Sequence, residues 1–303
     1  MSFECAGIEL DDKIAGKLIE KHAFKYETVK FIKSVKIPHA KFMSNLALSN
    51  IDNQILITDN EESILRSIDL KGKHLKTYGL NTGSKPSTFC TNANGDFVYV
   101  ANIERKKIEV YKNPNFEYVT EFGDSNIKKP DSMNIDHDTN LLYISEYDSN
   151  YVSVWSLDDH KYQTQIKIDS PAQIQIVDDK LFVISESDFE HIKTTGRIRI
   201  TKGSNSIFII NKLTNEIENK IKVDDWFDPC GLCVDNNQNI LTTAFELDND
   251  KYVSQKRFLY IFDRYFKQIK KFPLDFDYFT DMLLNDRKIF FCTYDNLRIV
   301  EFD

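Results

Sequence analysis

The 303-residue sequence lacks the long apolar segment that a membrane-spanning helix needs. No stretch of about 18 consecutive apolar residues occurs, and the first 25 residues lack the basic-then-apolar order of a secretory signal. These absences predict a protein without a membrane anchor, and we expect it in the cytoplasm.

Cysteine is scarce, with five residues at irregular spacing that make a poor disulfide framework. We therefore expect reduced thiols in an intracellular compartment. The pair Cys230 and Cys233 forms a Cys-x-x-Cys, but no second pair completes a zinc site, and it lies on an expected strand rather than at the start of a helix. We expect Cys90 and Cys233 to be small core residues, and Cys230 is the thiol to test for reactivity.

Positive charge is not in excess, since 39 Lys and Arg face 47 Asp and Glu for a net charge of −8. Nucleic-acid binders usually carry a basic face, so a nucleic-acid partner is not expected. The six histidines show no His-x-His or His-Glu-x-x-His spacing, and a metal built from them would need long-range convergence.

The stretch from Pro130 to Trp155, PDSMNIDHDTNLLYISEYDSNYVSVW, contains three short apolar runs. Turn residues at 137–140 and 148–150 separate the runs. Runs of four to six apolar residues bounded by Asp, Asn and Ser are typical of β-strands, and they leave no room for a helix.

This unit recurs along the chain, which predicts a repeat architecture. Its first elements are SNLALSN (44–50), PSTFCTN (86–92), PDSMNID (130–136), PAQIQIVD (171–178), PCGLCVD (229–235) and FTDMLLN (279–285). Its second elements lie at 54–60, 97–103, 141–147, 181–187, 240–246 and 288–294. Its third elements lie at 64–70, 107–112, 151–156, 206–212, 258–264 and 297–303. Each unit therefore predicts one multi-stranded blade.

A fourth, lysine-bearing element closes only five of the six units, at 73–79, 117–123, 162–168, 216–222 and 267–273. The lysine-alternating strand at 29–37 stands alone ahead of the first unit. We expect it to complete the sixth blade, so that the ring closes with N- and C-terminal strands in one sheet. Residues 1–26 form a separate segment with a short amphipathic helix at 10–23, and residues 27–303 form the propeller.

These repeats resemble the NHL-repeat family of six-bladed β-propellers. PCGLCVD is similar to the family's Pro-x-Gly-aliphatic-Ala-aliphatic-Asp opening, and KIEVY and YVSVW are similar to its Ile-x-Val-aromatic third strand. The resemblance covers about residues 27–303 and implies an all-β propeller with four-stranded antiparallel blades. No Gly-His…Trp-Asp signature is present, which disfavours a WD-repeat propeller.

The fourth and fifth units are longer than the others, with the excess between their second and third strands at 187–205 and 246–256. In propellers this connection lies on the same face as the loops that join one blade to the next. Long loops on a rigid scaffold often carry function. We therefore expect a raised rim on one face over blades 4–6.

Aromatic and charged residues are interleaved around the fifth unit, in VDDWFDP (223–229) and PLDFDYF (273–279). Aromatic anchors ringed by charge are typical of recognition surfaces, although the same rings could fold inward and plug the channel. The segment GRIRITKG adds a small basic finger, which is equally what an extra hairpin would show. The candidate binding residues are Trp226, Phe227, Phe276, Tyr278, Phe279, Arg197, Arg199 and Lys202.

Polar residues of the first strands offer an alternative site in the central channel. Some six-bladed propellers are hydrolases or lactonases that hold calcium there, and oxygen ligands of this kind suit Ca²⁺. The positions that this resemblance implies are Asn45, Asp131, Asn134, Gln173 and Asp281. First-strand polar residues also commonly just line a water-filled channel.

The sequence favours a non-catalytic scaffold that binds a protein or peptide on the rimmed face and needs no cofactor. The first alternative is a metal-dependent hydrolase or lactonase with Ca²⁺ or Zn²⁺ in the channel. The second alternative is a structural subunit of a larger assembly. The sequence carries no information on the oligomeric state.

Overall fold

The computed structural model describes residues 26–49, 51, 53–81, 85–192, 197–222, 226–247, 253–276 and 279–302. Over 187–192, 197–203, 226–228, 247 and 253–256 it describes the backbone only. The helix expected at 10–23 lies outside the described residues. No helix within the described ranges is long and apolar enough to cross a membrane.

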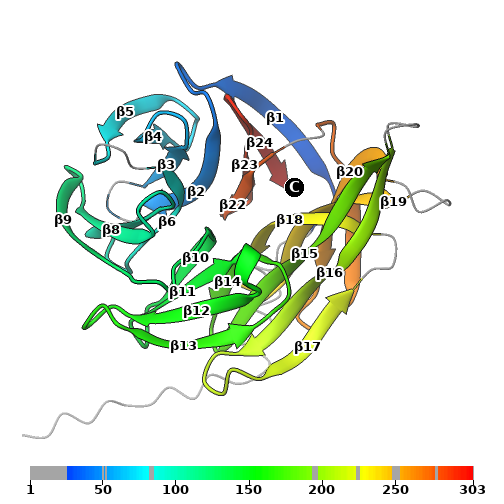
Figure 1. The fold of residues 1–303 in the computed structure, drawn as a ribbon. Coiled ribbons are helices and arrows are strands. Elements are labelled where there is room, and N and C mark those ends of the chain that lie inside the picture. Colours follow the sequence, from blue (N-terminus) through cyan, green and yellow to red (C-terminus); the bar gives the residue numbers. More distant parts are fainter. Residues whose placement is uncertain are drawn as a thin grey trace, which may run out of the picture.

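The strands of the described chain form six antiparallel sheets of four strands each, arranged in a ring (Figure 1). This confirms the predicted six-bladed β-propeller. The innermost strands are β2 (Met43–Ser49), β6 (Pro86–Thr91), β10 (Pro130–Asp136), β14 (Pro171–Val177), β18 (Trp226–Val234) and β22 (Asp281–Asn285). The second strands are β3 (Gln54–Asp59), β7 (Phe97–Asn102), β11 (Leu141–Glu146), β15 (Lys180–Ile192), β19 (Ile240–Leu247) and β23 (Lys288–Cys292).

The third strands are β4 (Ile64–Asp69), β8 (Lys107–Lys112), β12 (Tyr151–Ser156), β16 (Arg197–Asn211), β20 (Val253–Phe262) and β24 (Asn296–Phe302). The outermost strands are β5 (His74–Gly79), β9 (Glu117–Phe122), β13 (Tyr162–Lys167), β17 (Ile217–Lys222), β21 (Gln268–Pro273) and β1 (Val29–Lys36). A single short 3₁₀ turn, η1 (Tyr147–Ser149), interrupts the strands of the described chain. The repeat in the sequence therefore corresponds to the blades strand by strand.

The ring closes as the sequence predicts, because β1 pairs with the last strand of the chain. The order in this sheet is β1-β24-β23-β22, and the pairing runs antiparallel from Val29 opposite Phe302 to Lys36 opposite Asn296. Tyr26, just ahead of β1, is buried, packs edge-on against Phe302, and donates a hydrogen bond to Asp235 of the fifth blade. The start of the propeller is thus tied to both the sixth and the fifth blades.

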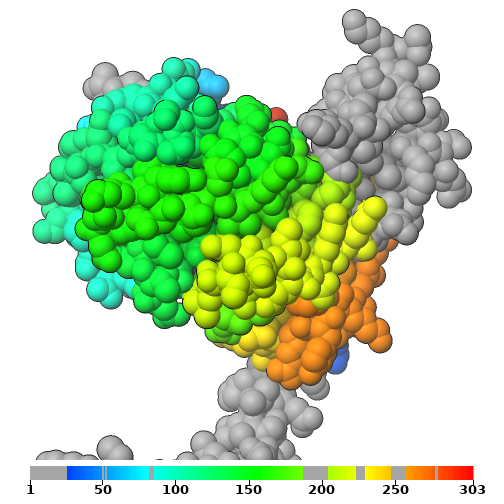
Figure 2. Space-filling view, turned by 60° about the horizontal axis from the view of Figure 1, so that its bottom comes forward, coloured from blue at the N-terminus to red at the C-terminus, as the bar shows by residue number. Residues whose placement is uncertain are grey.

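Burial along the strands explains their residue types. The third strand β12 is buried at four successive positions because both faces of its sheet are covered by neighbouring blades. The outermost strands β13 and β21 expose most of their side chains, which is why they carry lysine and glutamine. Figure 2 shows these walls as packed side chains, with the third blade in green, the fourth in yellow and the fifth in orange.

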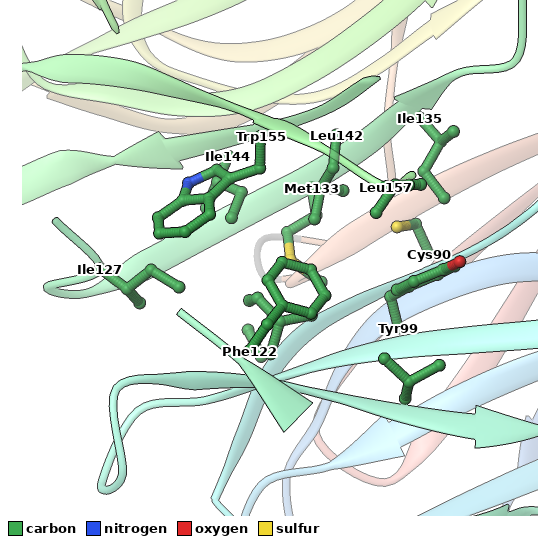
Figure 3. Packing of buried hydrophobic residues seen from close by; sticks show 13 residues of the cluster. Cys90, Tyr99, Phe122, Ile127, Met133, Ile135, Leu142, Ile144, Trp155 and Leu157 are labelled. Carbon is green, nitrogen blue, oxygen red and sulfur yellow. The ribbon is translucent and has the colours of Figure 1, made fainter. Parts of the chain in front are cut away.

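The apolar core lies between blades rather than within one of them. Figure 3 shows side chains from the second blade, among them Cys90, Tyr99 and Phe122, facing Met133 and Trp155 of the third. The Trp155 ring is 1% exposed and its centroid lies 6.0 Å from that of Phe122. Each blade therefore depends on both neighbours to bury its faces, and the ring is one cooperative unit.

Candidate binding face and channel site

The fourth blade carries a long β-hairpin where the sequence predicts an insertion. β15 has thirteen residues and β16 fifteen, whereas β11 and β12 in the third blade have six each. We call residues 187–192 and 197–203 the arm. Its strands stay paired from Ser187 opposite Gly203 to Ile192 opposite Arg197, and β15 and β16 both contact β18 of the fifth blade. In Figure 1 the two strands run past the rest of their blade.

The three candidate basic residues lie on one strand of the arm. Arg197, Arg199 and Lys202 belong to β16, where the register places them opposite Ile192, Glu190 and Asp188. An acidic residue thus faces two of the three basic positions across the hairpin, an arrangement that stabilises antiparallel pairs. The arm carries both signs of charge.

The fifth blade is extended beside the arm. Trp226 and Phe227 were expected in a loop between blades, but they belong to β18 and pair with Glu246 and Phe245 of β19. The innermost strand begins early here because β19 is long enough to pair with it. The neighbouring candidate Tyr278 lies outside the described residues.

Phe276 and Phe279 are core residues, which corrects the expectation that they face a partner. Both are buried, at 5% and 2% exposure. Their rings pack edge-to-face on Phe291, with centroids 5.0 and 5.1 Å away. They fill the space between the fifth and sixth blades, because that junction needs apolar side chains to cover both sheets.

The acidic and amide residues that end the second strands have a structural task, as their recurrence predicts. The Asp59 carboxylate accepts hydrogen bonds from the backbone N–H groups of Lys41 and Phe42, at 3.0 and 3.2 Å. Glu146 accepts from the N–H groups of Lys128 and Lys129, at 3.0 and 2.8 Å. Each therefore holds the chain that enters its own blade, and burial raises the pKa of Glu146 to about 7.

The channel contains a cavity of about 150 Å³ at the innermost strands. Four of the predicted channel residues line it, namely Asn45, Asn134, Gln173 and Asp281. Asp281 accepts hydrogen bonds from the backbone N–H of Leu46 at 2.8 Å and from Gln173 Nε2 at 3.2 Å. Gln173 therefore reaches from the fourth blade to the sixth, past the strand of the fifth.

The two channel carboxylates influence each other. Burial raises the pKa of Asp281 to about 7, against hydrogen bonds from Leu46, Met282 and Asn45 that favour the ionised form, and the charge of Asp131 adds to the rise. Burial among the strand ends raises the pKa of Asp131 to about 6. Water still reaches Asp131, which is exposed, so we regard its shift as smaller in effect. The channel holds carboxylates that ionise reluctantly.

Replacing Asp281 by Asn should stabilise the protein more at pH 8 than at pH 5. The folded-state pKa lies above the ordinary value of 3.8, so the carboxyl favours folding at low pH and opposes it increasingly as the pH rises towards 7. Asn removes the charge and keeps an oxygen for the Leu46 N–H. We expect a gain of about 2 kcal/mol at pH 8 by chemical denaturation, with Glu27→Gln, an exposed site, as control. A loss of stability at pH 8 would contradict the argument.

Two residues that the sequence analysis missed also line the cavity, Thr88 and Ser132. They lie one position after Ser87 and Asp131 in their first strands, at the level that Asp281 occupies in the sixth blade. Aligning the repeats from their closing Asp or Asn would have found them. The described residues contain no group of three or more His, Cys, Asp or Glu side chains placed to hold a metal ion.

The cysteines behave largely as predicted. Cys90 and Cys233 are buried core residues, and burial raises the pKa of both thiols well above the ordinary value. Cys230 is half-buried, with its sulfur 4.0 Å from the Thr280 carbonyl oxygen. Between the pair, Gly231 adopts φ +70°, and a Cβ there would lie 2.7 Å from Met282 Cγ. The glycine thus permits close approach of the fifth and sixth blades.

Six blades around a polar channel define this chain as a six-bladed β-propeller, and comparison with solved structures agrees. It is similar to hydrazine synthase of Kuenenia stuttgartiensis, with a TM-score of 0.62, 11% identity, and coverage of 88% of this chain and 97% of that chain. It is also similar to virginiamycin B lyase from Staphylococcus aureus, with a TM-score of 0.59, 12% identity, and coverage of 91% and 100%.

A catalytically inactive form of the same lyase with Quinupristin gives a TM-score of 0.59 at 13% identity. At such identities the likeness concerns the fold alone. No protein-family model matches the chain, and no curated protein matches it in sequence. The NHL-repeat assignment therefore remains a prediction.

Proposed function

We propose that this protein is a non-catalytic interaction module that binds a protein or peptide on the face bearing the arm, over blades 4–6. The observation that carries this proposal is the length of the hairpin. A blade closes with central strands of six residues, as β11 and β12 do. The extra residues of β15 and β16 cost backbone entropy and are not needed to complete the sheet.

The setting of the arm also supports a binding role. It contacts β18, the strand that carries Trp226 and Phe227, so the basic, acidic and aromatic candidates gather along one rim. A rigid ring beneath them lowers the entropy lost on binding, because the scaffold is ordered before the partner arrives.

The test replaces the arm, residues 188–202, by a two-residue turn and measures partner binding. A partner isolated with the intact protein should bind the shortened protein at least about tenfold more weakly, as expected when anchors at an interface centre are lost. Arg199→Ala and Trp226→Ala should each weaken binding in the full chain. Retention of full affinity by the armless protein would contradict the proposal.

The matched control alters a turn that joins the third and fourth strands of the same blade. Leu213 lies in the turn between β16 and β17 and is 72% exposed. Leu213→Ser should leave partner binding unchanged. Circular dichroism and thermal unfolding must show that each variant is folded.

The channel supports a second candidate function, a metal-dependent hydrolase or lactonase. The donor set of Asp131, Asp281, Asn45 and Gln173 consists of oxygen ligands, which suits Ca²⁺, and Gln173 Oε1 is buried without a hydrogen-bond partner. A bound calcium ion would polarise a substrate carbonyl. Titration of Ca²⁺ followed by thermal unfolding tests this: a rise in Tm that Asp281→Asn removes would support the metal site, and an unchanged Tm would argue against it.

A further inference from the structure

The mouth of the channel opens on the face that carries the arm. Lys129, just before β10, forms an ion pair of 3.3 Å with Asp148 in η1, the connection between β11 and β12. The start of an innermost strand thus lies at the same edge as the connection between second and third strands. In the fourth blade that connection is the end of the arm. Asp131 and Asp281, at the starts of β10 and β22, therefore belong to this face.

These two carboxylates have no cationic partner among the described residues. They come from the third and sixth blades, which are opposite each other in a ring of six. Asp281 accepts hydrogen bonds from neutral groups, the N–H groups of Leu46 and Met282 and the amide of Gln173. The cation closest in sequence, Lys129, is engaged with Asp148. The mouth is accordingly negative.

Acceptor atoms at the mouth also lack donors. Thr88 lines the cavity, is 1% exposed, and its hydroxyl makes no hydrogen bond with the residues that the structure describes. Gln173 Oε1 is buried and has no hydrogen-bond partner. Since buried polar atoms are nearly always satisfied, these two point to a ligand that donates hydrogen bonds.

The size of the cavity suits a small planar group. Its volume is about 150 Å³, and a cavity of about that volume can hold a molecule as large as benzene. A guanidinium group is planar, permanently charged and carries five N–H donors in a fork. It can satisfy a carboxylate and a nearby hydroxyl or amide oxygen at once, whereas an ammonium group is a more compact point charge.

We propose that the channel mouth binds the guanidinium group of an arginine side chain, presented by a protein or peptide that docks against the arm. The proposal rests on the function proposed above and adds to it the chemistry of the anchor. The carboxylates of Asp131 and Asp281 supply the charge, and Thr88 and Gln173 accept the remaining N–H groups.

The probe is the peptide acetyl-Gly-Gly-Arg-Gly-Gly-amide, and its control carries citrulline, which is neutral and nearly the same shape. Titration is followed by amide NMR shifts of the full protein. The arginine peptide should shift resonances around Leu46 and Met282 and bind at least about tenfold more tightly than the citrulline peptide. Equal binding of the two peptides, or no shift with either, would overturn the proposal.

Variants locate the site. Asp131→Asn and Asp281→Asn keep the side-chain shape and should each weaken the arginine peptide by about tenfold or more. Asp138→Asn lies in the same blade, on the turn between β10 and β11, where the side chain is 85% exposed. This control should bind as the unmodified protein does. Weakening by all three variants alike would show non-specific charge attraction and overturn the site.

Failure of this proposal differs from failure of the proposed function. If removing the arm abolishes partner binding while both Asn variants keep it, the interaction role stands and the arginine anchor is wrong. If the arginine peptide binds at the mouth while the armless protein keeps its partner, the pocket stands and the arm-bound partner is wrong. Binding of Ca²⁺ alone that displaces the peptide and is lost in Asp281→Asn would assign the mouth to a metal instead.

Discussion

A chain that begins at Pro38, and so lacks β1, should fail to form a stable monomer. Without β1, the edge of β24 is unpaired from Asn296 to Phe302, and an open edge invites pairing with another chain. The apolar clusters at both sides of the sixth blade also lose Val29 and Val35. We expect aggregation or loss of cooperative unfolding, measured by size-exclusion chromatography and thermal circular dichroism.

A peptide of residues 26–38 supplied in trans should restore a folded ring, because the closure is non-covalent. Two point variants in β1 refine the test. Val35 is half-buried and lies against Gly72 of the first blade, where a Cβ would come within 2.8 Å of Val35 Cγ2. Ser34 is exposed on the other face.

Val35→Asp should therefore cost about 2 kcal/mol or more of unfolding free energy, because it buries a charge without a partner. Ser34→Asp should stay within about 0.5 kcal/mol of the unmodified protein. Equal losses from the two variants would mean that strand pairing alone, rather than packing on the first blade, holds the ring closed.

Trp155→Ala should be among the most destabilising single substitutions in the chain. The indole is 1% exposed, contacts Phe122 of the second blade and Tyr162 of its own, and donates a hydrogen bond from Nε1 to Ser153 Oγ at 3.1 Å. Its removal leaves a cavity between two blades. We expect a loss of about 3–5 kcal/mol in chemical denaturation.

The control for this substitution is an aromatic residue outside the core. Tyr265 is 77% exposed, in the turn between β20 and β21, and Tyr265→Ala should change stability by no more than about 0.5 kcal/mol. A loss from Tyr265→Ala as large as that from Trp155→Ala would contradict the view that stability resides between blades.

Register explains why so much of the fold could be predicted. Each blade repeats the same order of strands, so the positions of Asp59 and Glu146 at the ends of second strands indicated a shared structural task, and both accept backbone hydrogen bonds. The missing fourth strand of the sixth unit led to residues 29–37 in the same way, because a ring needs equal blades.

The candidate site could be predicted only in part, because the same residue type serves two environments. Phe276 and Phe279 stand among carboxylates in the sequence, yet both rings are buried against Phe291. Trp226 was expected in a loop and belongs to β18. Local pattern does not show which neighbouring blade will cover a ring or how far a partner strand extends.

By itself, the sequence determined the number of blades, the order of their strands and the non-covalent closure, since these follow from short periodic patterns. Only the tertiary structure decided which polar residues meet in the channel. Asn45, Gln173 and Asp281 are far apart in the chain and converge on one cavity. Their contacts depend on the curvature of the ring, which arises from how large side chains pack between blades and is not written in any single repeat.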